Sequence, residues 1–388
     1  MSITDRDFFS QAALSGYPGE WDALCVLGPT ASGKTRFAVE LALYLGRWEN
    51  GSFIPGAEIL SADSRQVYKG MDIGTGKDLG DYRVNMGEYA ARCVKKGIST
   101  LWGGVPGDFC GKGLDHVWVD VPCHLLDRVE AGTKYNIFEY QRDFARAYAG
   151  VRERGRVPVI CGGSGLYIEA ATRRYELQEV VPDDRLRQRL EEEEMGLLID
   201  ICTWLKREKG AAPHNNTDFD TKKRVIRAIE IELAGFEEKS GPEQLFRAFH
   251  TDNISLLGPA AGKPEREISG NGSRDNIDGK LPQRCRYVGI RVDRDTRNAR
   301  IDSRLKARLE EGMLEEVQRL LDKGIPPDDL IYYGLEYKFV THYLTGVLGY
   351  DEMVEKLGIA IHQFAKRQMT WFRGMERRGM DIEWVVPV

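Results

Sequence analysis

The chain has 388 residues, of which 42% are apolar and 30% are charged, and its formal net charge is −5. This length is sufficient for one large domain with a sizeable addition. The composition excludes a chain coated with positive charge, although it does not exclude a local basic groove. No segment approaches the roughly 20 apolar residues that a membrane span requires.

Two features of the sequence favour a reduced cytoplasmic setting. The N-terminal segment MSITDRDFFSQAALSG has neither a basic start nor an apolar run, so it does not predict a secretory signal. The seven cysteines are odd in number and scattered, without a CxxC pair. We expect a cytoplasmic protein that acts as a monomer and has no membrane partner.

Three short apolar runs predict strands of one sheet. The first, at residues 23–27, stops at a glycine-rich turn and leads into an amphipathic segment at 36–42. A second run begins near residues 57–61, and a third at 157–161 again ends in a glycine turn. Strands that alternate with helices predict an α/β fold, a P-loop NTPase-like parallel sheet covered by helices on both faces.

The remaining segments predict an insertion, an appendage and a return to the core. Residues 1–180 are expected to form the catalytic core, with a glycine-rich insertion at about 78–117. Residues 181–240 are charged and helical, which indicates an appended helical domain. Residues 241–388 return to the core, with a flexible loop at about 258–283 and a basic helix near the C-terminus.

The strongest motif is GPTASGKT, which matches G-x-x-x-x-G-K-[ST] between a predicted strand and a predicted helix. The residues that we expect to hold phosphate groups are Gly28, Pro29, Thr30, Ala31, Ser32, Gly33, Lys34 and Thr35. Backbone N–H groups and the helix N-terminus favour phosphate, Lys34 adds a point charge, and the Thr35 hydroxyl can ligate Mg²⁺. Kinases, ATPases and GTPases share this loop. The absence of an N-K-x-D motif argues against a GTPase, whereas a small-molecule kinase remains an alternative.

A second candidate is Asp63, which follows the second predicted strand. Open α/β sheets bind ligands at the carboxyl ends of their strands, so this carboxylate is expected near the phosphates. It could hold Mg²⁺ through water or accept a proton from a nucleophile. It could equally cap the next helix, and the residues alone leave both roles open.

Four motifs in one order resemble the tRNA dimethylallyltransferases (isopentenyl transferases). They are GPTASGKT, SADSRQVYKGMDIGTGK at 61–77, VPVICGGSGLY at 157–167 and AKRQMTWFR at 365–373. The segments HLLD at 124–127 and NIFEYQRDF at 136–144 resemble the family's intervening region. Weaker matches at 223–230 and 300–304 keep the family order, so the resemblance covers nearly the whole chain outside the two inserted regions.

The resemblance implies transfer of a dimethylallyl group from dimethylallyl diphosphate to N6 of an adenine beside the tRNA anticodon. Diphosphate is released, and the glycine-rich loop would hold the diphosphate of the donor. By this resemblance Mg²⁺, Lys34, Thr35 and Arg300 would neutralise the charge that grows on the leaving group. Asp63 would take the N6 proton as the amine attacks C1 of the donor.

The resemblance also implies contacts with tRNA, because the adenine must leave the stacked anticodon loop. The implied contacts are Asp63, Ser64, Arg65, Gln66, Ser164, Lys223, Arg224, Arg227, Lys366, Arg367, Gln368 and Arg373. The family usually has Thr at the position of Ser164, which keeps the hydroxyl. Trp371 and Phe372 could stack on a base or belong to the core, and the sequence leaves this open.

One departure from the family concerns the acceptor. The family's Gly-Tyr-Arg/Lys element is Glu336-Tyr337-Lys338 here, and a carboxylate near RNA would repel phosphate or require a changed loop path. Transfer to a free adenine nucleotide is therefore the first alternative. An RNA-binding protein without catalysis is a further one.

Overall fold

The computed structural model describes residues 2–10, 15–98, 113–173, 180, 183–208, 219, 221–234 and 281–387. The chain divides into two compact units. One unit combines Met1–Tyr175 with Arg274–Val388, and the other is Glu176–Ser273. Most of the predicted flexible loop at 258–283, and residues 99–112 of the predicted insertion, lie outside the described residues.

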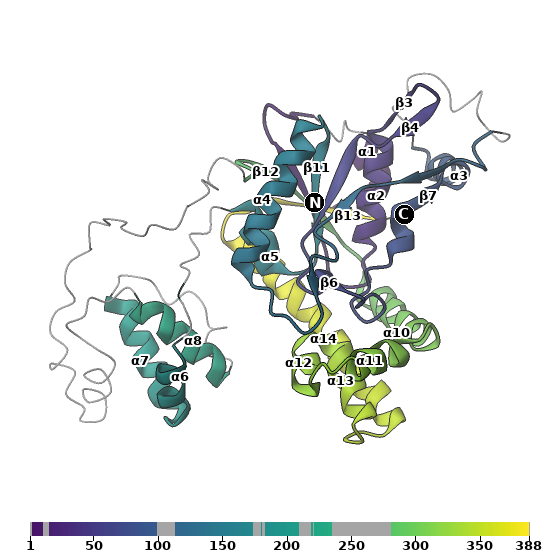
Figure 1. Cartoon of the computed structure of the whole chain (residues 1–388). Coiled ribbons are helices and arrows are strands. Elements are labelled where there is room, and N and C mark those ends of the chain that lie inside the picture. Colours follow the sequence, from purple (N-terminus) through teal and green to yellow (C-terminus); the bar gives the residue numbers. More distant parts are fainter. Residues whose placement is uncertain are drawn as a thin grey trace. The chain divides into compact units, whose positions relative to one another are not determined.

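A seven-stranded sheet forms the centre of the first unit, and all its neighbouring strands are parallel (Figure 1). In spatial order the strands are β1 (Ser2–Thr4), β13 (Ile382–Val386), β12 (Cys285–Ile290), β2 (Ala23–Leu27), β11 (Val157–Gly162), β5 (Ala57–Ser61) and β9 (Cys123–His124). The predicted α/β class is confirmed. Because β2, β11 and β5 are neighbours, the loops after their carboxyl ends lie at one edge.

Helices cover both faces of this sheet. Three of them are α2 (Lys34–Tyr44), α4 (Ile137–Glu153) and α5 (Gly165–Thr172). Along β2, Leu24 and Val26 pack with the core beneath α2, whereas Cys25 and Leu27 pack with α4 and α5. All five β2 residues are buried, as expected for a strand with both faces covered.

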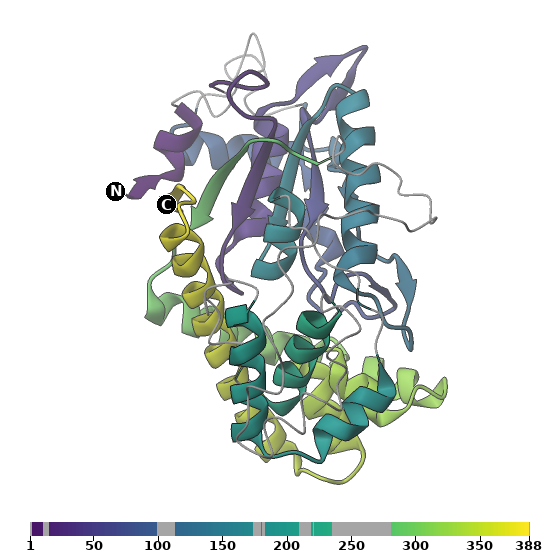
Figure 2. The ribbon, with the colours of Figure 1, turned by 90° about the vertical axis from the view of Figure 1, so that its left-hand side faces the viewer.

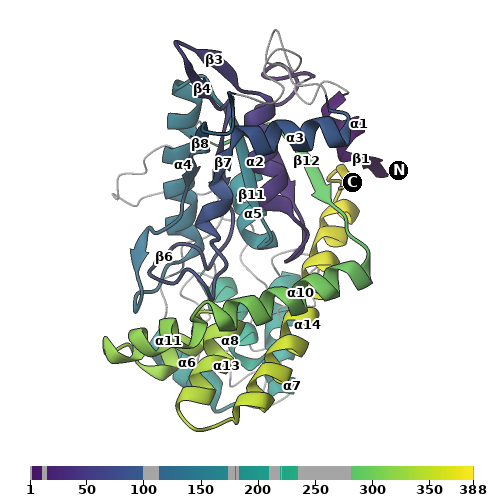
Figure 3. The same cartoon turned by 90° about the vertical axis from the view of Figure 1, so that its right-hand side faces the viewer.

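The C-terminal part of the chain adds a helical layer beyond the carboxyl edge of the sheet, drawn in green and yellow in Figures 1 to 3. Its helices are α10 (Arg294–Glu310), α11 (Met313–Asp322), α12 (Pro327–Tyr332), α13 (Leu335–Leu344) and α14 (Tyr350–Arg377). From this layer α14 leads back to β13, which pairs with β1, so the two termini lie close together (Figure 2). Within the described part of the chain, every helix is too short or too polar to span a bilayer.

Smaller elements surround the sheet. They are α1 (Asp5–Ser10), β3 (Arg47–Glu49), β4 (Ser52–Ile54), β6 (Tyr68–Lys69), the 3-10 turn η1 (Leu79–Tyr82), β7 (Arg83–Asn85), α3 (Met86–Lys96), β8 (Trp118–Asp120) and β10 (Val129–Glu130). The segment predicted as a glycine-rich insertion contains η1, β7 and α3. Asn85 caps α3 by accepting the Glu88 N–H, and Gly97, with a φ of 63°, ends it.

The second unit is described only through its helices α6 (Asp184–Glu191), α7 (Met195–Glu208) and α8 (Lys222–Leu233). Leu190, Leu198, Ile201, Val225 and Ile229 are buried between them and form its core. Helical periodicity in this charged region therefore buries one apolar stripe and leaves charges outside.

Candidate active site

The phosphate-binding loop connects β2 to α2 and depends on glycine at two points. Gly33 has a φ of 86° and precedes the first residue of α2, a conformation that L side chains rarely adopt. A Cβ atom at Gly28 would lie 2.6 Å from Oγ of Ser32 and 3.3 Å from the Ile290 carbonyl oxygen. The backbone thus closes into a cradle at a helix N-terminus, where phosphate is favoured.

Two hydroxyl groups belong to the cradle. Among the described residues, the buried Oγ of Ser32 has no hydrogen-bond partner. Thr35 follows Lys34 in the first turn of α2 and is half-buried. A buried hydroxyl without a partner costs free energy that a bound oxyanion or a hydrated cation would recover.

Asp63 lies beside this cradle, at the carboxyl end of the neighbouring part of the sheet. Its Oδ1 accepts the Arg65 N–H at 3.0 Å, which fixes the carboxylate in the turn after β5. The carboxylate is half-buried, and its charge acts on Lys34. The structure therefore places Asp63 just after the carboxyl end of β5, where its charge acts on Lys34, and its role as a base stays a prediction.

Burial and neighbouring charges act in opposite directions on the pKa of Lys34. Burial lowers the pKa of Lys34, while the Cys161 thiol and the Asp63 carboxylate raise it and Arg304 and Arg308 lower it further. The net shift is downward, so the ammonium ion is less stable here than in water. A bound diphosphate would remove this cost, because it places negative charge beside three cations.

The turn after β5 meets the turn after β11 at one edge. The Ser64 N–H donates to Oγ of Ser164 at 3.4 Å, and Ser164 precedes the first residue of α5. Gln66 receives a hydrogen bond from Oγ of Ser61 at 3.0 Å and donates to the Gly76 carbonyl at 3.0 Å. The structure thus brings together Ser64 and Ser164, both expected to contact tRNA, whereas the Gln66 amide is already engaged within the protein.

Arg65 reaches across to the helical layer. Its Nη1 donates to the carbonyl oxygen of Tyr332, the last residue of α12, at 2.6 Å. The Tyr332 ring is exposed beside it. This contact connects the turn that carries Asp63 to the C-terminal helices.

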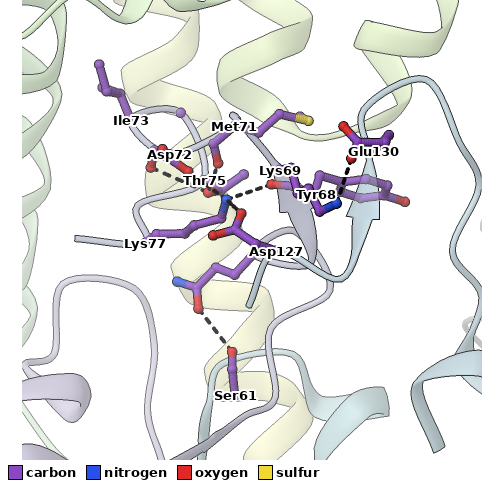
Figure 4. Close-up of polar contacts among 12 residues, drawn as sticks. Ser61, Tyr68, Lys69, Met71, Asp72, Ile73, Thr75, Lys77, Asp127 and Glu130 are labelled. Atoms are coloured by element: carbon purple, nitrogen blue, oxygen red, sulfur yellow. Dashed lines mark hydrogen bonds and ion pairs between the residues drawn. The ribbon is translucent and has the colours of Figure 1, made fainter. Parts of the chain in front are cut away.

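A buried lysine holds the loop between β5 and η1, and sequence reasoning did not single it out. The side chain of Lys77 is fully buried, and Nζ lies 2.6 Å from the Asp72 carboxylate and 2.6 Å from the Tyr68 carbonyl oxygen. It also pairs with Asp127 of the HLLD segment (Figure 4). The sequence feature that could have identified Lys77 is its position as the last residue of the 61–77 motif.

Glu316 on α11 holds the same loop from the opposite side. Its carboxylate accepts the backbone N–H groups of Asp72 and Ile73 at 2.8 Å each and of Gly74 at 3.0 Å. The Tyr337 hydroxyl donates to it at 2.6 Å. Three backbone donors and a buried hydroxyl make this carboxylate a structural centre of the loop.

The arginines of α10 that act on the cradle differ from the predicted one. The sequence suggested Arg300, which is exposed on α10. The arginines that lower the pKa of Lys34 are Arg304 and Arg308, one and two turns further along the helix. Arg300 lies on the same helix as these two arginines, and its role toward the leaving group stays a prediction.

Glu336 is placed at the start of α13 among these arginines. Its Oε1 lies 3.6 Å from Nη1 of Arg308. Burial raises the pKa of Glu336, while Arg308, Arg65 and Arg304 act in the opposite direction. The carboxylate therefore faces cations of the protein itself, and its expected repulsion of RNA phosphate stays a prediction.

The basic residues of α14 divide into two groups. Lys366, Arg367 and Arg373 are exposed, whereas Gln368 is 7% exposed. The Gln368 amide donates to the Gly163 carbonyl at 2.9 Å and accepts the Thr30 N–H at 2.8 Å. In place of the predicted RNA contact, Gln368 connects α14 to two loops of the site.

The structure also shows where Trp371 and Phe372 of α14 lie. Phe372 is fully buried in the core. Trp371 is half-buried and packs on the backbone of Gly165, where a Cβ atom would lie 2.1 Å from its ring. Glycine at this position therefore permits α14 to approach the turn after β11.

Three further residues expected to contact tRNA lie in the second unit. Lys223 and Arg224 are exposed on α8, while Arg227 pairs with Glu230 at 2.9 Å and donates to the Val180 carbonyl at 2.9 Å. Arg187 pairs with the same carboxylate at 2.8 Å. Arg227 thus has a structural role in its own unit.

Comparison with known proteins gives consistent results. The family model described as IPP transferase matches residues 116–375. The chain is 44% identical to tRNA dimethylallyltransferase 1 of Porphyromonas gingivalis over 93% of each chain. It is also 44% identical to tRNA dimethylallyltransferase 2 of Bacteroides fragilis, over 94% of this chain and 93% of that protein. Among solved structures, it is similar to the full-length tRNA isopentenylpyrophosphate transferase of Bacillus halodurans, with a TM-score of 0.52 and 26% identity over 94% of this chain and 90% of that one.

Proposed function

Because this chain belongs to the IPP transferase family, we propose that it transfers a dimethylallyl group from dimethylallyl diphosphate to N6 of an adenine beside the anticodon of tRNA. The observation that supports the proposal is that Asp63 follows the carboxyl end of β5, at the edge of the sheet that also carries the phosphate cradle, where its charge acts on Lys34. This arrangement supplies a base on one side of the reacting atoms and cations on the other.

The diphosphate of the donor occupies the cradle between Gly28 and Thr35. Lys34 and Arg304 stabilise the negative charge that forms on the diphosphate as its oxygen leaves C1 of the prenyl group. Without a ligand the surroundings destabilise the charged form of both side chains. The pKa of each is lowered, and burial is the largest cause. The site is therefore built for an anion.

Asp63 removes the proton that the reaction releases. The N6 lone pair forms the new bond to C1 while the bond from C1 to the diphosphate oxygen breaks, and the N6 proton moves to the Asp63 carboxylate. The Arg65 N–H that donates to Oδ1 fixes the orientation of this carboxylate. Alignment matters here because an exocyclic amine is a weak nucleophile.

The residues present also fit Mg²⁺. The Thr35 hydroxyl and the Asp63 carboxylate are oxygen ligands of the kind that this ion takes beside phosphate and water, and Oγ of Ser32 is a further buried oxygen without a protein partner. Within the described residues, no three His, Cys, Asp or Glu side chains converge, and a site completed by phosphate and water does not need them. When bound, the ion would neutralise charge on the leaving diphosphate.

The tRNA is bound in part by exposed cations. Lys366, Arg367 and Arg373 lie on the helix whose Gln368 contacts the cradle, so phosphates held there are close to the site. Ser64 and Ser164 hold the extruded adenine in this proposal, which their contact with each other at the edge of the sheet supports. The pairing of Glu336 with Arg308 supports tRNA over a free nucleotide as the acceptor, because the charge of this carboxylate is opposed by a cation of the protein.

Incubation with labelled dimethylallyl diphosphate, Mg²⁺ and either unmodified tRNA or AMP tests the proposal. We expect label in tRNA and none in AMP. Label in AMP alone would assign a nucleotide acceptor. Label in neither, with ATP turnover that depends on a small acceptor, would replace the proposal by a kinase.

A further inference from the structure

A group of charged side chains lies beside the cradle, and two of its largely buried members have no part in the reaction described above. The group, which we call the charge cluster, consists of Lys34, Asp63, Arg65, Asp78, Arg304, Arg308 and Glu336. The two largely buried members without a role are Arg308 and Glu336. Both are largely buried, so neither is an ordinary surface charge.

Arg308 is held tightly but is incompletely hydrogen-bonded. It is 9% exposed, its Nη1 lies 3.6 Å from Glu336, and its Nη2 lies 3.9 Å from Asp78. Among the described residues its Nε has no hydrogen-bond partner. A Cβ atom at Gly76 would lie 1.8 Å from Nη2, so the guanidinium group packs directly on that backbone.

Arg304 competes with Arg308 for one carboxylate. It lies one turn earlier on α10 and pairs with Asp78, the residue that Arg308 also approaches. Burial and the charge of Arg308 lower the pKa of Arg304 to about 10, and Glu336 and Asp63 act against this shift. Two arginines four residues apart on a helix repel each other, so a carboxylate between them is needed.

We propose that Glu336 and Arg308 are a positioning pair that holds Arg304 on Asp78, with its charge directed to the diphosphate site. The proposal rests on the prenyl transfer proposed above, since Arg304 is assigned there to the leaving group. Glu336 draws the Arg308 guanidinium toward α13 and leaves Asp78 to Arg304. The acidic residue at this position therefore works only together with an arginine at position 308.

Three variants test the coupling: Glu336→Gln, Arg308→Met and the double variant. With Glu336→Gln, Arg308 takes Asp78 and displaces Arg304. With Arg308→Met, Glu336 draws Arg304 away from the site. We expect each single variant to lower kcat about tenfold with an unchanged KM for tRNA, and the double variant to return to within about threefold of the wild type. A double variant with the product of both losses would overturn the proposal.

Two controls separate positioning from general damage. Glu352→Gln removes a carboxylate from the first turn of α14, where it pairs with Lys356 in solvent, and is expected to leave kcat unchanged. Arg308→Lys keeps the charge and should retain most of the activity, whereas equal losses in Arg308→Lys and Arg308→Met would exclude a charge pair. This second comparison stands even if Glu336→Gln does not fold.

Binding of inorganic diphosphate, measured by calorimetry, makes the test independent of turnover. We expect weaker binding in both single variants and recovery in the double variant. If the wild type transfers no prenyl group to any acceptor, the proposed function fails. The pattern of diphosphate binding in the variants still tests whether Glu336 and Arg308 act as a positioning pair. Unchanged diphosphate binding in both single variants, together with unchanged kcat, would refute the pair itself.

Discussion

Gln368 Oε1 accepts the backbone N–H of Thr30 at 2.8 Å, across 338 positions of the sequence. The same side chain donates to the Gly163 carbonyl, and a Cβ atom at Gly163 would lie 2.4 Å from its Nε2. One amide therefore fixes the loops after β2 and β11 relative to α14. The helix that carries the exposed cations is thereby attached to the phosphate cradle.

Replacement of Gln368 by Leu is expected to weaken binding of the prenyl donor. The substitution leaves the Thr30 N–H and the Gly163 carbonyl without their partner, at a cost of about 1 to 3 kcal/mol. We expect a rise in the KM for dimethylallyl diphosphate of about tenfold and little change in the affinity for tRNA, measured by filter binding. Lys366→Gln, two positions earlier and exposed, is the control, and it should show the opposite pattern.

Conversion of Asp63 to Asn tests the assignment of the base. The amide keeps the size of the side chain but cannot take the N6 proton, so kcat should fall roughly 10²- to 10⁴-fold. Binding of tRNA and inorganic diphosphate should be nearly unchanged. An Asp63→Asn enzyme with wild-type kcat would assign the carboxylate to the turn, where it accepts the Arg65 N–H.

Much of the core was predictable from the sequence because local patterns determine it. The apolar run of β2, the glycines of the cradle and Lys34 are contiguous, and their spacing alone requires a strand, a turn and a helix. The position of Asp63 followed from one further step, that a residue after a strand of a parallel sheet lies at the ligand edge. The structure places it there.

Features that depend on tertiary contacts were not predictable in this way. Arg300 and Arg304 lie on one helix one turn apart, and only packing of α10 decides which of them approaches Lys34. In the sequence, Glu336 is only a departure from the glycine of the family's motif. Its distance to Arg308 in the structure shows that a cation opposes its charge. The role of Gln368 depends on a contact between residues far apart in the chain.

Glu58 provides a prediction about the dependence of stability on pH. Burial favours protonation of this carboxyl, but hydrogen bonds from Arg154 at 2.7 and 2.9 Å and from His124 at 2.7 Å outweigh it and lower the pKa of Glu58. Since the folded-state pKa lies below the unfolded one, the stabilisation is present above the unfolded pKa and is lost as pH falls through the folded pKa.

The variant Glu58→Gln is therefore expected to be less stable by about 1 to 3 kcal/mol at pH 7. Urea unfolding of both proteins between neutral pH and the acid range checks this value. The difference should shrink as the pH falls below the ordinary range of a glutamate. A difference that stays constant down to acid pH would show that the charge of Glu58 contributes nothing.

The exposed cations of α14 yield the prediction that separates binding of RNA from chemistry. Lys366, Arg367 and Arg373 are exposed, so their removal disturbs no buried contact of the core. A triple change to Gln should raise the KM for tRNA and leave diphosphate binding unchanged. Since each lost phosphate contact reduces the salt dependence of binding by about one unit of the logarithmic slope, the slope should fall by roughly 2 to 3.

The control is the pair Lys306→Gln and Lys323→Gln. These exposed lysines lie on α10 and at the end of α11, outside the proposed tRNA-binding surface. If the control pair changed the salt slope as much as the triple variant, the tRNA would be held by the general charge of the protein and not by α14.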